Sequence, residues 1–221
     1  MNLSLKPLAL ASLTLALGLS VPALAAAPPT HAHAATAAAP AAAQAPKLHA
    51  AMRSLWHGHI VHAREYAMAV HAHNDARAKK AADAVVANAH QISDAVGGFY
   101  GKAAGDQMMT LLGGHWGAVK AMTDARAHND TAAADTAMSN LTANAGDIAK
   151  FLAGANPNLP EDTVRGMLLA HGAHHSQQIN LINANDHAGE AKEWKAMQAH
   201  MDTVADALAG AIVKQFPAKA S

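Results

Sequence analysis

The strongest constraint in this sequence is an internal repeat with a period of 56 residues. Short motifs that end in histidine recur at this spacing, at His59, His115 and His171. A second set of positions recurs with the same period further along each unit, at Asn88, Asn144 and His200. A fixed period indicates that one structural unit is used several times. We therefore expect the chain to contain three copies of one unit.

Each unit has the pattern of a helical hairpin. Asn and Asp occur near its middle, at 73–75, 128–130 and 184–186, where they can end one helix and cap the next. Glycine and proline mark the boundaries between units, at 97–101 and 154–160. We expect six helices, at about residues 48–72, 76–96, 104–127, 131–153, 161–183 and 188–214. Because the connections are short, the predicted fold is all-α, a bundle of three antiparallel hairpins.

Composition supports this fold class. Hydrophobic residues make up 51% of the chain and aromatic residues only 4%, so much of the apolar content is alanine. Alanine leads the scale of helix formers and is depleted in strands. Small side chains therefore favour closely packed helices over a sheet.

The two ends of the chain are expected to lie outside this bundle. Residues 1–25 are typical of a cleaved signal peptide, with Lys6, an apolar stretch and Ala23-Leu24-Ala25 before the cleavage site. Residues 26–46 are rich in alanine and proline and are expected to form a disordered tether. The predicted bundle domain is 47–217, followed by a tail at 218–221. These features predict a periplasmic or secreted protein.

Several function classes are disfavoured by the sequence. Lys and Arg total 16 and Asp and Glu total 16, so there is no electrostatic case for nucleic acid or an anionic membrane as a partner. The absence of cysteine excludes disulfides, thiolate metal sites and a thiol nucleophile. After the signal peptide, no apolar stretch is long enough to cross a bilayer. The common motifs of hydrolases, metalloproteases and nucleotide-binding enzymes are missing as well.

Helical spacing places the repeated polar residues in the core. His59 lies in the apolar stripe of the first helix, and Asn88 lies in the stripe of the second. Both are 14 or 15 residues from the turn, so an antiparallel hairpin brings them to one level. The third unit has His171 and His200 at these positions. If the hairpins close around a common axis, all six side chains form one layer, whereas a row of hairpins would separate them.

Two interpretations of this layer remain open. In the first, histidine and asparagine form hydrogen-bonded core pairs, and the protein is a structural or interaction bundle without a cofactor. In the second, the imidazoles bind a Cu, Zn or Ni ion. The inner ligands would be His59, His115, His171 and His200, with His62, His174 and His175 as second choices and Asn88 and Asn144 as further ligand contacts. We adopt binding of a metal ion or small ligand as the working hypothesis. A metal-dependent enzyme would need an open coordination position.

Other histidines carry less information. His57 is expected to point away from the helix face that His59 and His62 share. His49, His90 and His187 have no spacing signal and are expected at the surface. Arg64 is expected to take part in a charge pair with Glu65 at the surface.

The chain also resembles a family of small, uncharacterised bacterial helical proteins with three histidine-containing repeats. The resemblance spans about residues 48–217. It rests on these segments: Leu55-Trp56-x-x-His59 with Arg64, Asn88 to Gly101, Leu111-Leu112-x-x-His115, Asn144-Ala145-x-Asp147-Ile148, Met167-Leu168 with His171, and Ile212 to Pro217. It implies the helical fold and the three matched histidines, and it implies no established activity. The signal peptide and the high histidine content depart from the family pattern.

Overall fold

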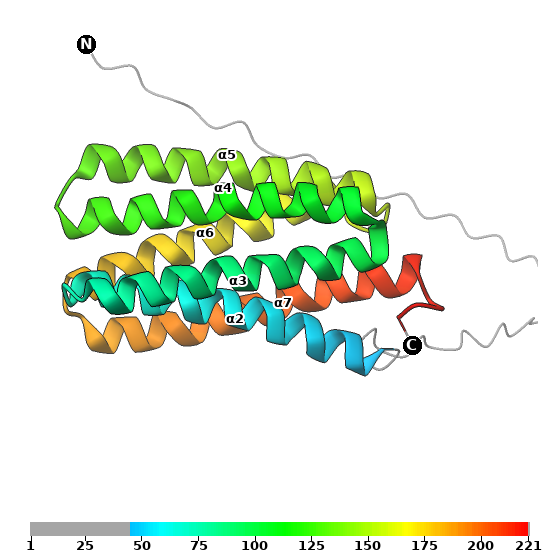
Figure 1. Ribbon diagram of the computed structural model, residues 1–221, viewed down its shortest axis with the longest axis horizontal. Coiled ribbons are helices and arrows are strands. Elements are labelled where there is room, and N and C mark those ends of the chain that lie inside the picture. Colours follow the sequence, from blue (N-terminus) through cyan, green and yellow to red (C-terminus); the bar gives the residue numbers. More distant parts are fainter. Residues whose placement is uncertain (1–44, 221) are drawn as a thin grey trace, which may run out of the picture. The chain divides into compact units, whose positions relative to one another are not determined.

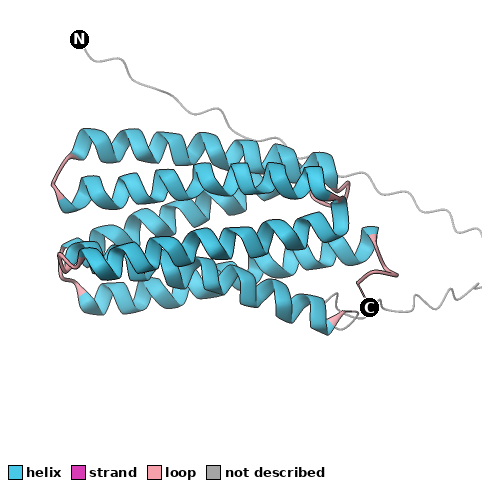
Figure 2. Cartoon of the chain, viewed as in Figure 1, coloured by secondary structure: helices cyan, strands magenta, loops and turns pink. Residues whose placement is uncertain are grey.

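The computed structural model describes residues 45–220 of the chain, and this part is all-α. The described residues form six helices and no strand (Figures 1 and 2). They are α2 (Pro46–His71), α3 (Asp75–Tyr100), α4 (Lys102–Ala127), α5 (Thr131–Ala155), α6 (Glu161–Asn183) and α7 (His187–Gln215). The predicted all-α bundle is confirmed. The predicted signal peptide and nearly all of the predicted tether lie outside the described residues.

The hairpins close around a common axis. Each helix packs against the next one along the chain, and α7 packs against α2. The helices α2, α4 and α6 also contact one another, and α3, α5 and α7 each pack against two of them. The first helices of the three hairpins therefore form the inside of the bundle. This arrangement excludes a row of hairpins and brings side chains from all three hairpins together.

The apolar core has two parts, one on each side of the histidine positions. Residues that precede the histidines on the inner helices, such as Met52, Trp56 and Leu112, belong to one buried cluster. Residues that follow them, such as Tyr66 and Val119, belong to the other. The repeated histidines thus lie in a layer between two apolar clusters.

The three turns within hairpins share one backbone geometry. His73, Asn129 and Asn185 adopt the left-handed conformation, with φ of 51°, 57° and 56°. At each turn, the following residue donates its N–H to the carbonyl five residues back, as Asn74 does to Ala69. This is a Schellman motif, which satisfies the free carbonyls of the first helix. Figure 1 shows that all three turns lie at one end of the bundle.

One predicted helix boundary is wrong. We expected the glycines at 97 and 98 to break the chain, but α3 continues to Tyr100 and ends at Gly101, where φ is 92°. Gly97, together with Gly105, instead allows α3 and α4 to approach closely. A Cβ added at Gly105 would lie 2.9 Å from the carbonyl oxygen of Ser93 and 3.2 Å from the Cα of Gly97.

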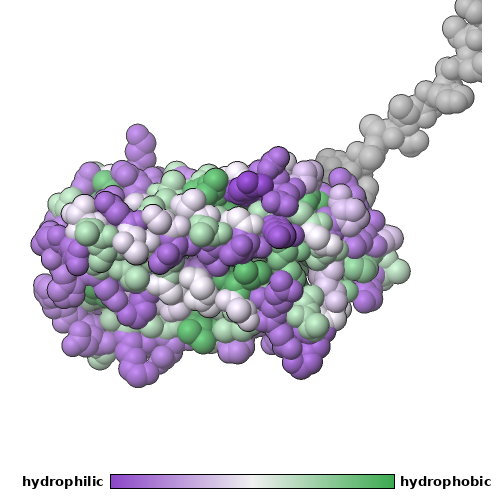
Figure 3. Space-filling view, turned by 90° about the horizontal axis from the view of Figure 1, so that it is seen from above, coloured by the Kyte–Doolittle hydropathy of each residue, from purple (hydrophilic) through white to green (hydrophobic). Residues whose placement is uncertain are grey.

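The surface of the bundle has a mixed character. Figure 3 shows polar and apolar residues interspersed on the face that it presents. Among the described residues, the exposed large hydrophobic side chains are Met68, Val86 and Leu169, which lie on three different helices. None of the described helices combines the length and the apolar character needed to cross a membrane.

Substituting two helical glycines tests the close packing of α3 and α4. Gly105→Ala is expected to destabilise the protein by about 1–3 kcal/mol, because its Cβ would meet backbone atoms that cannot move independently. Gly98→Ala is the matched control, since a Cβ there meets nothing within 4 Å. It is expected to stabilise the helix by about 0.5–1 kcal/mol. Urea unfolding of both variants measures the difference, and equal effects would contradict the close approach.

Candidate metal centre

Four histidines converge inside the bundle. They are His59 on α2, His115 on α4, and His171 and His175 on α6, and each is only 2–3% exposed. Each offers one ligand atom, and these atoms all lie within 4.8 Å of one another. The closest rings are those of His171 and His175, with centroids 4.4 Å apart, because residues four apart share a helix face. We call these four residues the inner cluster.

Several imidazole nitrogens in the inner cluster have no hydrogen-bond partner. The Nε2 atoms of His59 and His115 and the Nδ1 atom of His171 are buried and unpaired. The Nε2 atoms of His171 and His175 lie 3.1 Å apart. Leaving a buried polar atom unpaired costs about 1–3 kcal/mol. The four side chains therefore do not satisfy one another.

Burial keeps the inner cluster neutral. Desolvation, with the nearby His115 and His62, lowers the pKa of His59 to about 3. Desolvation also lowers the pKa of His115 to about 4. The hydrogen bond to Asn144 raises this pKa, but by less than desolvation lowers it. The pKa values of His171 and His175 lie well below the ordinary 6.5. The main cause is desolvation, and the neighbouring histidines lower these pKa values further. Since metal ions bind the neutral imidazole, these side chains are in the ligating form at pH 7.

Asn144 determines which nitrogen of His115 carries the proton. Its Nδ2 donates to the carbonyl of Leu111 at 3.0 Å, so its Oδ1 faces the Nδ1 of His115 at 3.3 Å. An amide oxygen only accepts, so Nδ1 of His115 is the donor. The neutral ring then has its lone pair on the unpartnered Nε2. An outer partner that orients a ligand in this way is common at metal sites.

The same backbone contact occurs in all three hairpins. Asn88 donates to Leu55, Asn144 to Leu111, and His200, through Nε2, to Met167, each at 3.0 Å. A Cβ added at Gly58 or Gly114 would lie 2.8 or 3.1 Å from the asparagine Nδ2 of the same hairpin. Glycine thus leaves space for the amide. Asn88 and Asn144 tie the two helices of a hairpin together.

The predicted ligands are only partly brought together. His59, His115 and His171 converge as expected, and His175 joins them. His200, expected as the fourth ligand, bonds the backbone instead, and its ring centroid is 6.4 Å from that of His171. His62 pairs with Glu65 at 3.1 Å, and His174 pairs with Glu193 at 2.5 Å.

A sequence signal for His175 was available. With a period of 56 residues, His175 is equivalent to Val119 and Ala63, which are both buried. A histidine at a position that is otherwise apolar lies on the inner face of its helix. His200 replaces an asparagine on an outer helix, where the side chain reaches the neighbouring backbone first.

Two predictions about the surface are wrong. His49 is buried, with 5% exposed, and its Nδ1 lies 2.9 Å from Asp206, because α7 packs across the start of α2. Arg64 pairs with Glu190 rather than Glu65, through two hydrogen bonds of 2.6 and 2.8 Å.

The buried Glu190 was missed by sequence reasoning. It lies one turn before Trp194 and two turns before Met197, on the buried stripe of α7, and this spacing could have identified it. Gln178 also donates to Glu190, at 3.1 Å. The hydrogen bonds from Arg64 lower the pKa of Glu190, so it is ionised at pH 7. This network crosses from α2 to α6 and α7 beyond the inner cluster.

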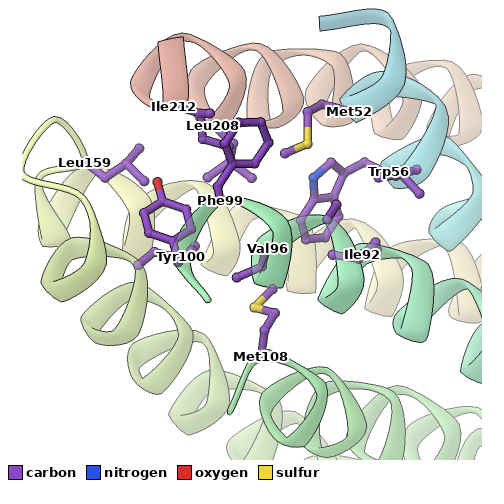
Figure 4. Close-up of a pocket in the computed structure, with 13 residues that line it drawn as sticks. Met52, Trp56, Ile92, Val96, Phe99, Tyr100, Met108, Leu159, Leu208 and Ile212 are labelled. Atoms are coloured by element: carbon purple, nitrogen blue, oxygen red, sulfur yellow. The ribbon is translucent and has the colours of Figure 1, made fainter. Parts of the chain in front are cut away.

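An apolar pocket lies on the other side of the inner cluster. Figure 4 shows side chains of α2, α3, α4 and α7 that line it, including Met52, Phe99 and Leu208. Trp56 separates this pocket from the inner cluster, since its ring contacts His59 at a centroid distance of 6.1 Å. The indole Nε1 is buried and has no hydrogen-bond partner.

The stability of the metal-free protein is expected to fall below pH 6.5. The unfolded chain takes up protons on these histidines near that pH, whereas folded His59 and His115 do so only near pH 3 and 4. Between pH 6.5 and 5 each of them therefore lowers the free energy of unfolding with a slope that grows to about 1.4 kcal/mol per pH unit. Urea unfolding at pH 7, 6 and 5 measures this slope. His115→Asn should flatten it, and a stability independent of pH in this window would contradict the buried neutral state.

No protein-family model, curated protein or solved structure matches this chain. The assignment of the site therefore rests on its own residues and contacts.

Proposed function

We propose that this protein binds one transition-metal ion through His59, His115, His171 and His175. The observation that supports this proposal is the convergence of four buried imidazoles, three of which have a nitrogen without a hydrogen-bond partner. A core that serves only for structure pairs its buried polar atoms. A metal ion would take up the lone pairs that the protein leaves unpaired.

The ligand set indicates the class of ion. Four neutral imidazoles suit Zn, Cu and Ni, whereas Ca and Mg require oxygen ligands. Tetrahedral Zn with Zn–N bonds of about 2.0–2.1 Å needs nitrogens roughly 3.4 Å apart. The ligand atoms here lie within 4.8 Å of one another, so small side-chain rotations would close the site. We propose Cu, Zn and Ni as candidate ions.

Four protein ligands favour holding an ion over catalysis with it. Catalytic zinc sites keep one position open for water or substrate, whereas four protein ligands close a tetrahedral site. A metal-dependent enzyme would require one inner histidine to leave the ion or an added ligand to join it. We therefore propose storage, transport or sequestration of the ion as the role of the site.

A structural bundle without a cofactor is the second candidate. The hydrogen bond between His115 and Asn144 and the three contacts to backbone carbonyls favour it. These bonds satisfy atoms that face away from the inner cluster. They leave the unpaired Nε2 atoms of His59 and His115 unexplained.

Two further parts of the proposal come from the sequence. The predicted signal peptide would place the protein in the periplasm or outside the cell. Metal ions that enter from the medium would reach it there before they reach the cytoplasm. We also propose that the chain belongs to the family of helical repeat proteins that it resembles. The balance of charges continues to argue against nucleic acid as a partner.

Elemental analysis and thermal unfolding test the proposal. The untagged protein should carry one Zn, Cu or Ni ion per chain, and its Tm should rise with ion concentration. At a free ion concentration 1,000 times Kd, the expected stabilisation is about 4 kcal/mol. His171→Ala and His175→Val should each lose the stoichiometric ion and the shift in Tm.

Two features make this test specific. His175→Val introduces the side chain found at Val119, the equivalent position of the second hairpin, so this variant is expected to fold. His90→Ala removes an exposed histidine of α3 and should change neither measurement. Equal ion content in the wild-type protein and in His175→Val would overturn the proposal.

A further inference from the structure

A second pair of histidines lies outside the inner cluster, between α6 and α7. The ring centroids of His174 and His200 are 5.1 Å apart, within the 4.4–5.9 Å range of the inner cluster. Both side chains are partly exposed, 24% in the case of His174, whereas the inner histidines are almost fully buried. The ring of His200 also stacks on that of His171, at 6.4 Å. Ring contacts thus lead from the partly exposed His174 through His200 to the inner cluster.

The hydrogen bonds of this pair leave one lone pair on each ring. The carboxylate of Glu193 accepts from Nδ1 of His174, so the Nε2 of the neutral ring has the lone pair. The carbonyl of Met167 accepts from Nε2 of His200, which leaves the lone pair on Nδ1. In the neutral form, each ring therefore has one nitrogen that is free to bind a metal ion.

We propose that His174 and His200 form an outer metal station through which an ion reaches the inner cluster. The proposal rests on the proposed function of the inner cluster. Glu193 orients His174 and supplies a negative charge at the entrance, while the inner cluster contains no carboxylate. Such carboxylate–histidine pairs are typical of residues around a metal site. The ion would bind the outer pair first and then pass to His171 and His175.

Differences among the three hairpins support this inference. Asn88 and Asn144 make the same backbone contact as His200, so a histidine is not required to tie the third hairpin together. What the imidazole adds is a nitrogen lone pair. The positions equivalent to Glu193 are alanines, Ala81 and Ala137. The carboxylate and the second ligand thus occur together in one hairpin.

His62 is another partly exposed histidine near the inner cluster. It is equivalent to His174 by the 56-residue period, and it pairs with its own carboxylate, Glu65. Within the described part of the chain it makes no ring contact with another histidine, and the position equivalent to His200 is Asn88. His62 therefore has the orienting carboxylate without the second ligand, which makes it the natural control.

A double variant that copies the other two hairpins tests the outer station. Ala170→Gly with His200→Asn restores the glycine and asparagine found at Gly58 and Asn88, so the amide can bond the carbonyl of Met167. Co²⁺ is the probe, because its visible absorption reports coordination by the inner cluster. The variant should still bind one Co²⁺ per chain with unchanged affinity. Its rate of loading in stopped-flow absorbance should fall by about tenfold or more.

Two more variants complete the design. Glu193→Gln should also slow the loading of Co²⁺, since it removes the negative charge and weakens the hydrogen bond that orients His174. His62→Asn should load at the wild-type rate. Wild-type rates in the double variant, with one Co²⁺ still bound, would overturn the outer station and leave the proposed function intact. If neither the wild-type protein nor the double variant binds a stoichiometric Co²⁺, the proposed function fails, and this inference fails with it.

Discussion

Burying an imidazole away from water is unfavourable unless both nitrogens find partners, and this bundle depends on how that requirement is met. Four imidazoles lie in one layer between two apolar clusters. Nδ1 of His115 meets the amide of Asn144, while one nitrogen each of His59, His115 and His171 has no hydrogen-bond partner. A chain under selection for stability alone would fill such a layer with apolar side chains, as it does at Val119 and Ala63. The metal ion that we propose would supply the partners that this layer lacks.

The closed arrangement of hairpins is what makes one site out of scattered residues. Because α2, α4 and α6 contact one another, each hairpin contributes at least one imidazole to the same point. The outer helices support this layer through a recurrent bond to a backbone carbonyl, made by asparagine in two hairpins and by His200 in the third. That bond needs a close approach, which glycine permits at Gly58 and Gly114. Where the third hairpin departs from this pattern, it gains both a fourth histidine in the inner cluster and a second histidine pair near the surface.

Much of this fold followed from sequence pattern, and the errors have identifiable causes. The six helices and their turns were predicted closely, because Asn and Asp caps mark the turn in the middle of each hairpin. The glycines at 97 and 98 were misread as breakers, since a glycine that ends a helix, such as Gly101, looks the same in sequence as one inside a helix, such as Gly97. Three of the four histidines of the inner cluster were predicted from their period, and His175 was named only as a second choice. His200 was preferred over His175 because it stands where the other two hairpins have a polar asparagine. His175 stands where they have Ala63 and Val119, so it was given less weight.

Periodicity within one chain determines which residues face inward, because helix geometry repeats every 3.6 residues wherever the helix lies. That local rule was enough for the helices, for the level of the histidines along each hairpin and for the burial of His59, His115 and His171. Which inward side chains meet is a different matter, since it depends on the rotation of each helix and on which hairpins touch. Closure of the ring, the exclusion of His200 from the inner cluster and the pairing of Arg64 with Glu190 were decided only by the tertiary structure. These contacts join residues far apart in the chain, and local spacing carries no information about them.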